Sequence, residues 1–340
     1  MKVARLYSRD DIRIEEIDAP EPDEGEILVQ TRACGICTGD IMGWYMERKA
    51  PLVFGHEPSG VVAAVGPGVA ELSVGDRVFV HHHAPCGRCR HCNRGAYVHC
   101  KTWRSTGLRP GGMAEYFAVP AANVAADTLR LPDSVSFEAG SLIEPAACVV
   151  KSLRRGGLQT SDVVVVVGLG VMGQLHVALA ANAGARVIAA DLVPFRLERA
   201  LELGAEAVVD VSKESLAEGV AARNDGVGGD LVIVGPGSIE AMESGIESAA
   251  PGGRVVLFTT SQPDDRLSVS PFRIYFDEVS LIPSYSCGPD DTREALKLIV
   301  DGCVPVDRLV THRFGLESVI EAMDAAGRVD EALKAVVLFE

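Results

Sequence analysis

The sequence predicts a mixed fold: a largely antiparallel β part followed by an α/β part on a parallel sheet. Short strand-like runs, punctuated by glycine and proline turns, fill residues 1–145. The run DVVVVV at residues 162–167 is continuous, apolar and β-branched, which is typical of a strand buried on both faces of a parallel sheet. Strand and helix signals alternate after it, as stacked βαβ units require.

The expected elements follow this division in order. In the first part, strands are expected at 26–31, 60–65 and 77–80, with little helix. A helix at 146–155, ended by a Gly-Gly pair, marks the change of pattern. The α/β part then has strands at 162–167, 185–190, 207–209, 231–234 and 254–258, with a helix at 194–203. Past residue 283 we expect helices at 291–300 and 316–327 and a last strand at 335–339.

Length and charge restrict the class of protein. The chain has 340 residues, of which 47% are hydrophobic and 23% charged, and its formal net charge is −15. This is globular composition with room for two domains. The negative charge argues against nucleic acid and anionic membrane surfaces as partners. No apolar run suits a membrane span or a secretion signal, so we expect a cytoplasmic protein, in which nine cysteines serve as metal ligands or thiols.

A glycine loop follows the valine strand. The sequence GLGVMG at 168–173 stands between this strand and an Ala/Leu-rich helix, and Asp191 ends the next strand. This context is typical of a dinucleotide site, in which the glycines admit the pyrophosphate and the acid binds the adenosine ribose. The residues expected at the cofactor are Gly168, Gly170, Val171, Met172, Gly173, Asp191 and Arg196.

The acid also predicts which cofactor is bound. Asp191 would repel a 2′-phosphate, which favours NAD over NADP, and Arg196 is the nearest cation that could soften this preference. The alternative is that Asp191 is only a solvated charge at a strand end.

Four cysteines lie close together in sequence, with the spacing C-x₂-C-x₂-C-x₇-C. Four thiolates suit a closed, structural Zn²⁺ site, although an iron–sulfur cluster takes the same ligands. A nucleic-acid-binding zinc ribbon without catalysis is a further alternative, which the net charge disfavours. The quartet is Cys86, Cys89, Cys92 and Cys100.

A second set of metal-ligating residues is more scattered. Cys37, His56, Glu57 and Glu144 together offer a thiolate, an imidazole and carboxylates, a donor set suited to an open, catalytic zinc. Each is ambiguous alone, since a lone cysteine is usually a core residue and a His-Glu pair is usually a surface one.

With the quartet and the glycine loop, these residues resemble the zinc-dependent medium-chain alcohol/polyol dehydrogenase family over essentially the whole chain. Gly75-Asp76-Arg77-Val78 and the run GGMAEY at 111–116 belong to the resemblance. Glu144-Pro145 is similar to the sorbitol/iditol and threonine dehydrogenase branches. The resemblance implies an α/β plus β fold, with a GroES-like catalytic domain (1–147), an inserted Rossmann NAD-binding domain (148–284) and a return to the catalytic domain (285–340).

The resemblance also implies roles for individual residues. Cys37 and His56 bind the catalytic zinc with Glu144, while Glu57 lies beside the metal and exchanges with Glu144 or water. Asp40 orients His56 from behind. The family's proton-relay hydroxyl, two residues after the cysteine, is replaced by Gly39, and a hydroxyl stands next to it on Thr38. The proton route therefore stays open between Thr38, Tyr45, Glu57, a histidine of 81–83 and water.

The implied reaction is the NAD-dependent interconversion of a secondary alcohol and its ketone by hydride transfer, with two zinc ions per chain. The substrate is a polyol, a cyclitol or a similar small molecule, with L-threonine or a simple secondary alcohol as alternatives. Trp44, Tyr45 and Trp103 are candidates for the pocket. The resemblance further implies a homo-oligomer, either a dimer or a tetramer.

Overall fold

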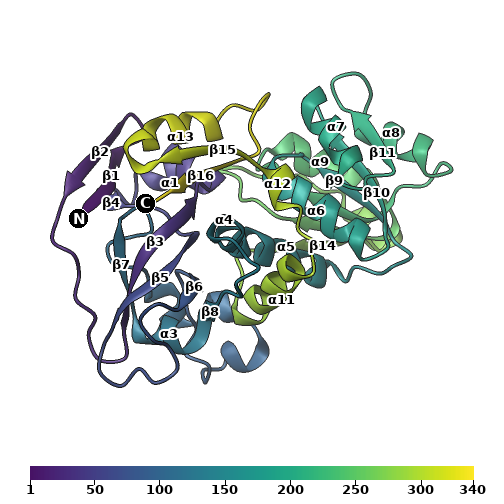
Figure 1. The fold of residues 1–340 in the computed structure, drawn as a ribbon. Helices are drawn as coiled ribbons and strands as arrows, with labels where there is room; N and C mark the ends of the chain where they lie inside the picture. The colour runs from purple at the N-terminus through teal and green to yellow at the C-terminus, as the bar shows by residue number, and fades with distance from the viewer. The chain divides into compact units, whose positions relative to one another are not determined.

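The structure is a computed structural model that describes residues 1–340 (Figure 1). Contacts divide the chain into two compact units. The first comprises Met1–Ala147, Cys287–Gly302 and Val306–Glu340, and the second comprises Cys148–Ser286 and Cys303–Pro305. The chain passes from the first unit to the second within α5 (Ile143–Gly156). None of the helices has the length and apolar character that a membrane crossing requires.

The first unit is built on β-sheets. One has the strand order β15-β16-β3-β5-β6-β8, with β7 also paired to β3, and a smaller one has the order β2-β1-β4. All pairs are antiparallel except β15 with β16. The strands are β1 (Lys2–Ser8), β2 (Asp11–Glu16), β3 (Ile27–Gly35), β4 (Leu52–Val53), β5 (Pro58–Val65), β6 (Arg77–Val80), β7 (Tyr116–Val119), β8 (Thr128–Arg130), β15 (Val310–Gly315) and β16 (Lys334–Leu338).

Short helices link these strands, and the segment that returns after the second unit supplies longer ones. They are η1 (Thr38–Ile41), α1 (Gly43–Met46), η2 (Cys92–Arg94), η3 (Tyr97–His99), α2 (Lys101–Ser105), α3 (Ala121–Asp127), α4 (Phe137–Ser141), α11 (Pro289–Val300), α12 (Val306–Leu309), η4 (Leu316–Ser318) and α13 (Val319–Ala326). Helix α13 packs its apolar side onto β15 and β16.

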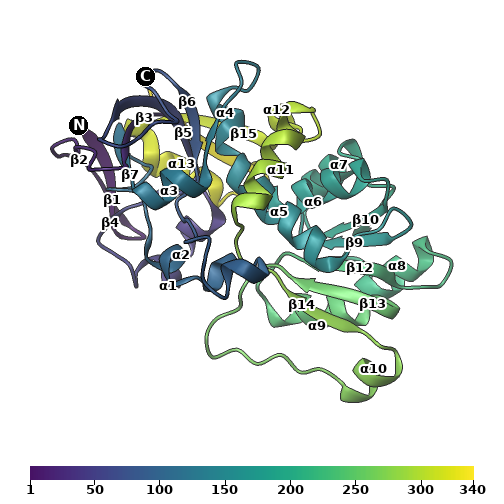
Figure 2. The ribbon, with the colours of Figure 1, turned by 90° about the horizontal axis from the view of Figure 1, so that it is seen from below.

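The second unit is a doubly wound parallel sheet with the order β11-β10-β9-β12-β13-β14 (Figure 2). This is the strand order of a Rossmann fold. The all-valine β9 (Val163–Val167) lies in the middle and every residue in it is buried, as the sequence pattern predicts. The other strands are β10 (Arg186–Asp191), β11 (Ala207–Asp210), β12 (Gly229–Val234), β13 (Ala249–Leu257) and β14 (Ser280–Pro283). The helices are α6 (Val171–Asn182), α7 (Pro194–Glu202), α8 (Leu216–Arg223), α9 (Ile239–Glu247) and α10 (Pro271–Phe276).

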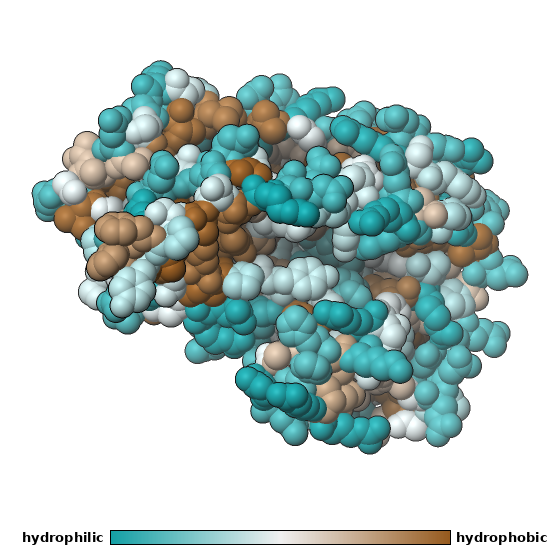
Figure 3. Space-filling view, turned by 180° about the vertical axis from the view of Figure 1, so that it is seen from behind, coloured by the Kyte–Doolittle hydropathy of each residue, from teal (hydrophilic) through white to brown (hydrophobic).

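The expected fold class is confirmed, whereas several element boundaries differ. Helix α5 begins at Ile143, before the expected start, because Pro145 falls in its first turn, where a proline removes no helical hydrogen bond. Strand β13 starts at Ala249 instead of 254. Strands β14 and β15 had no prediction, since both are short and partly exposed and carry no clear alternation. Hydrophilic side chains make up most of the face seen in Figure 3, in keeping with the charged composition.

Candidate active site and cofactor loop

The turn after β3 presents the first expected zinc ligand. Cys37 caps the short helix η1, and its Sγ accepts a hydrogen bond from the Gly39 N–H at 3.3 Å. The buried Asp40, in the same turn, accepts from the Cys37 N–H through Oδ2 at 3.0 Å. These contacts fix the thiol at the end of a strand, so that the turn itself sets the position of the ligand.

Asp40 also contacts the second expected ligand. Its Oδ1 lies 3.3 Å from Nδ1 of His56, which leaves the Nε2 of His56 for a metal. Burial alone would lower the pKa of His56, but the charges of Asp40 and Cys37 raise it well above its usual value. Burial likewise opposes the charge on Asp40, yet His56 holds the pKa of that carboxyl below its usual value. Asp40 therefore contacts the imidazole that it is predicted to orient.

Glu57 is the neighbouring carboxylate, and it has a partner that the sequence gave no reason to expect. Its Oε2 forms an ion pair with the Nζ of Lys334, at the start of β16, and both side chains are 1% exposed. The Lys334 ammonium also donates to the Ile36 carbonyl at 2.9 Å. Gly35 makes room for this pair, because a Cβ at that position would overlap the Glu57 carboxylate. Burial raises the pKa of Glu57, and Lys334 opposes this shift.

The structure brings three of the four expected ligands together. Ligand atoms of Cys37, His56 and Glu57 lie within 4.8 Å of one another, whereas the Glu144 carboxylate is grouped with His81 and His82 at the same spacing. Glu144 occupies the first turn of α5 and is buried. The two carboxylates thus come from different segments, Glu57 from the residue just before β5 and Glu144 from α5.

The donors present fit a zinc ion. A tetrahedral zinc with bonds of about 2.0–2.3 Å separates its ligand atoms by about 3.3–3.8 Å, which the Cys37–His56–Glu57 group can accommodate with small side-chain rotations. Thiolate, imidazole and carboxylate are the ligand types of catalytic zinc. Thr38, the nearest hydroxyl in sequence, is exposed on the first turn of η1.

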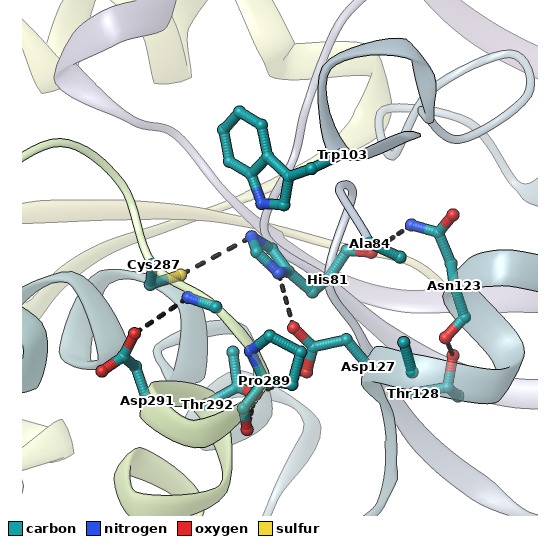
Figure 4. A network of polar contacts seen from close by, with 12 residues as sticks. His81, Ala84, Trp103, Asn123, Asp127, Thr128, Cys287, Pro289, Asp291 and Thr292 are labelled. Carbon is teal, nitrogen blue, oxygen red and sulfur yellow. Dashed lines mark hydrogen bonds and ion pairs between the residues drawn. The ribbon is translucent and has the colours of Figure 1, made fainter. Parts of the chain in front are cut away.

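His81 belongs to a buried network that sequence reasoning missed (Figure 4). Its Nδ1 lies 2.7 Å from Asp127 and its Nε2 lies 3.5 Å from the Cys287 Sγ. Thr292 donates to the other Asp127 oxygen, and Asn123 donates to the His81 carbonyl at 2.8 Å. Burial opposes charging of His81, but Cys287 and Asp127 raise its pKa well above the usual value. The network ties the end of β6 to α3 and to the returning α11.

The rings of His82 and His83 follow His81 in the chain and form a row of tilted aromatic contacts. The His82 ring centroid lies 4.9 Å from that of His56 and 4.1 Å from that of His83, and the His83 centroid lies 4.1 Å from that of Trp103. Burial and the neighbouring imidazoles hold the pKa of His82 well below its usual value. Trp103 packs among the quartet cysteines at its other side.

The four sulfur atoms of the cysteine quartet lie close together. The Sγ atom of Cys92 lies 3.5 Å from that of Cys89 and 4.0 Å from that of Cys86, and all four sulfur atoms lie within 4.8 Å of one another. Zinc–sulfur bonds of about 2.3 Å put tetrahedral sulfurs about 3.8 Å apart, while a disulfide needs about 2.05 Å. Burial disfavours the Cys100 thiolate, but donors from Cys86 and Trp103 lower its pKa to about 6. Four cysteines in this geometry could hold one tetrahedral zinc ion.

The glycine loop of the second unit has the local geometry of a dinucleotide site. Gly168 has φ +82°, which only glycine adopts freely, and a Cβ on Gly173 would overlap the Gly168 carbonyl oxygen. A Cβ on Gly170 would meet nothing within 4 Å, so this position is open to a ligand. Helix α6 starts directly afterwards, with Val171 and Met172 in its first turn, and its N-terminal N–H groups suit a phosphate.

Asp191 lies at the end of β10 and is 6% exposed. Its Oδ2 accepts from the Leu169 N–H at 2.6 Å, and its Oδ1 accepts from the Leu192 and Val193 N–H groups at 2.8 and 2.9 Å. Arg196 approaches to 3.8 Å. The carboxylate thus braces the glycine loop, so the alternative of a solvated strand-end charge is wrong.

Comparison with known proteins agrees with this geometry. The profile of the family described as alcohol dehydrogenase GroES-like domain matches residues 23–133, and the zinc-binding dehydrogenase profile matches residues 171–301. The sorbitol dehydrogenase of Bacillus subtilis (strain 168) is 30% identical over 99% of this chain and 97% of its own length. The L-threonine 3-dehydrogenase of Pyrococcus abyssi (strain GE5 / Orsay) is 32% identical over 91% and 90%.

One of the similar solved structures contains a bound cofactor. The crystal structure of a short chain alcohol dehydrogenase from E. coli CFT073, complexed with NADH, superposes with a TM-score of 0.90 at 28% identity, over 100% of this chain and 99% of that one. Two family profiles, full-length relatives and this structural match agree with the donor sets and the glycine loop described above. The chain belongs to the zinc-dependent medium-chain alcohol/polyol dehydrogenase family.

Proposed function

We propose that this chain oxidises a secondary alcohol of the polyol or cyclitol type to its ketone with NAD⁺, and catalyses the reverse reduction. The observation that carries the proposal is the grouping of Cys37, His56 and Glu57, with Asp40 behind the imidazole. A binding module built only on the cysteine quartet would not need this second donor set. That alternative also leaves the glycine loop without a use.

Residues of the first unit have separate roles at the reacting carbon. Cys37 and His56 would hold the metal with Glu144 or Glu57, and Asp40 would keep the His56 Nε2 pointed at it. A zinc ion in this set supplies Lewis acidity that lowers the pKa of a substrate hydroxyl, and NAD⁺ accepts the hydride. Lys334 pairs with Glu57, which favours Glu144 as the resting third ligand and Glu57 as the exchanging one.

The residues of the second unit select the cofactor. Gly168, Gly170 and Gly173 shape the loop for the pyrophosphate, with Val171 and Met172 at the helix N-terminus. Asp191 retains acceptor capacity beyond its three backbone hydrogen bonds, since each carboxylate oxygen has two lone pairs. We assign this capacity to the adenosine ribose, with Arg196 beside it, so NAD is the expected cofactor.

A second candidate substrate is L-threonine, which also carries a secondary alcohol. The Pyrococcus relative, named L-threonine 3-dehydrogenase, supports it over nearly the same span of the chain as the sorbitol dehydrogenase does. The two candidates differ in the charged ammonium and carboxylate groups that L-threonine carries.

The test combines metal analysis with a substrate screen. Purified protein is expected to contain about two zinc ions per chain and to reduce NAD⁺ with at least one alcohol among polyols, cyclitols, L-threonine and simple secondary alcohols. Serine substitution of a quartet cysteine should remove one zinc and lower the melting temperature, because a closed thiolate site contributes to folding free energy. One zinc per chain and no turnover with any alcohol would overturn the proposal.

We also propose that the chain forms a homo-oligomer through the outer edge of the second unit. Strand β14 is the last strand of its sheet, so one side of it is unpaired. Helix α10, which precedes β14 in the chain, exposes Phe272, Tyr275 and Phe276 by 71%, 76% and 65%. An unpaired strand edge and an exposed aromatic patch both suit contact with a second copy of the same surface.

A further inference from the structure

The three consecutive histidines after β6 differ in what their side chains contact. His81 is held by Asp127 and Cys287, and the Nδ1 of His83 donates to the Thr106 carbonyl at 3.0 Å. The Nδ1 of His82 is buried and has no hydrogen-bond partner. Buried polar atoms are almost always partnered in folded proteins, so His82 stands out as an imidazole with unused hydrogen-bonding capacity.

His82 also lies next to the expected zinc ligands. Its ring centroid is 4.9 Å from that of His56. A ring nitrogen of His82 also lies within 4.8 Å of a Glu144 carboxylate oxygen. An oxygen that hydrogen-bonds to two atoms at about 2.8 Å, with a tetrahedral angle, spans about 4.5 Å between them. The upper limit of 4.8 Å between His82 and Glu144 is thus compatible with one hydroxyl group that hydrogen-bonds to both.

We propose that His82 binds a second hydroxyl of the substrate, on the carbon next to the reacting one, so that the enzyme prefers vicinal diols and polyols to monoalcohols. The inference rests on the proposed function, which places the reacting hydroxyl at Cys37 and His56. An imidazole can both accept and donate, so it can bind a hydroxyl in either orientation. A site built to hydrogen-bond a hydroxyl discriminates strongly against the analogue that lacks it.

The His81 network explains how His82 keeps its position. His81 is 0% exposed and is fixed from two sides, which holds the backbone at the end of β6 (Figure 4). The ring of His82 also contacts the rings of His56 and His83. The imidazole is thus oriented before the substrate binds, which reduces the entropy lost on binding.

Two measurements test the inference, one of turnover and one of binding. Turnover compares kcat/KM for butane-2,3-diol isomers with that for butan-2-ol, in the wild type, His82→Phe and His82→Gln. Binding uses 2,3-dimethylbutane-2,3-diol and 2,3-dimethylbutan-2-ol, which carry no hydrogen on the hydroxyl-bearing carbons and cannot be oxidised. Their Kd values are measured by calorimetry with NAD⁺ present. His83→Phe is the matched control, because it changes the neighbouring ring without touching the His82 nitrogens.

In the wild type we expect the diol to exceed the monoalcohol about tenfold in kcat/KM and about fivefold or more in affinity. His82→Phe, which keeps a ring in the stack, should reduce both ratios to about two or less, while His82→Gln and His83→Phe keep most of the preference. A wild type that treats diol and monoalcohol alike overturns the inference, as do ratios unmoved by His82→Phe. The proposed function fails separately, when no alcohol reduces NAD⁺. If His82→Phe does not fold, the Kd values of the two non-oxidisable ligands for the wild type still test the inference, because equal values overturn it.

Discussion

Individual residues of the first unit carry charge in places where water does not reach. Lys334 and Glu57 are both 1% exposed, and the Asp40 side chain beside His56 is 2% exposed. Each buried charge has an opposite charge or a hydrogen-bond donor in contact with it. Pairs of this kind hold their geometry well, because loss of one partner leaves the other uncompensated.

Lys334→Met should destabilise the fold by about 3–5 kcal/mol, since it leaves the Glu57 carboxylate buried without its cation. Urea unfolding of the variant against the wild type measures this. The double variant Lys334→Met/Glu57→Gln removes both charges and should recover most of the loss, and Lys334→Arg should lose less than Lys334→Met. Equal destabilisation of the single and double variants would show that the pair is not coupled.

Cys37→Ser and His56→Ala should each abolish turnover and lower the zinc content by about one ion per chain, because three ligands hold a catalytic zinc and loss of one weakens it. Metal analysis and NAD⁺ reduction are measured on the same preparation. Cys34→Ser is the matched control, since the Cys34 thiol is buried among apolar residues in the same segment. Full activity of the His56→Ala protein would refute the ligand assignment.

We expect the wild type to prefer NAD⁺ over NADP⁺ by about tenfold or more in kcat/KM, which corresponds to about 1.4 kcal/mol. Asp191→Ser should reduce this preference. Serine retains one oxygen for the Leu169 N–H but removes the charge that repels a 2′-phosphate. The control is Asp210→Ser, at the equivalent end of the neighbouring strand β11. A wild type that prefers NADP⁺, or a ratio that Asp191→Ser leaves unchanged, would contradict the assignment.

At the scale of elements, the glycine loop and the cysteine quartet could be predicted from the sequence, because the residues that define each of them lie close together in the chain. The valine strand, the three glycines and Asp191 all occupy the expected places in β9, the loop and β10. Lys334 was not predictable, because it meets Glu57 only once β16 lies against β3. Asp127, Cys287 and Thr292 reach His81 from α3 and from the returning segment, so no local pattern marks them.

Two alanine substitutions separate packing from cofactor binding within the loop. Gly173→Ala brings a Cβ into the Gly168 carbonyl and should lower the melting temperature by several degrees, as a strained buried contact of about 1–3 kcal/mol does. Gly170→Ala meets nothing in the protein, so it should leave the melting temperature within about 2 °C but raise the KM for NAD⁺ about tenfold or more, by occupying the space of the pyrophosphate. Thermal melts and NAD⁺ titrations test both variants. The reverse pattern would refute the cofactor assignment.

At the scale of the whole molecule, the first unit is assembled from separate stretches of chain, while the second is nearly continuous. Hydropathy and motif spacing show the change of pattern near residue 145, but they do not reveal which strands of the first unit pair with the returning segment. That pairing depends on contacts between residues about three hundred positions apart, such as Val337 with Cys34.

The proposed homo-oligomer is expected to depend on one surface of the molecule. Phe276→Glu with Tyr275→Glu puts two charges on the exposed face of α10 and should shift the protein toward the monomer, because like charges would face each other across a symmetric contact. Light scattering after size exclusion gives the mass. The control Val74→Glu changes a similarly exposed apolar residue in the first unit. An unchanged mass for the α10 variant would move the interface elsewhere.

The pairing of β16 with β3 also sets an order of events during translation. The Ile36 N–H donates to the Ala335 carbonyl at 2.9 Å, and Lys334 brings its ammonium to Glu57, so the turn that carries Cys37 is completed by residues about three hundred positions later in the chain. The ribosome releases the stretch 148–286 earlier, and this stretch holds all of its own sheet. A nascent chain can therefore contain the complete parallel sheet of the second unit before β16 is made. At that stage β3 lacks its β16 neighbour and Glu57 lacks Lys334. The predicted zinc ligands of that turn therefore gain their complete surroundings only after residue 335 is synthesised, whereas the four quartet cysteines are all present in the chain by residue 100.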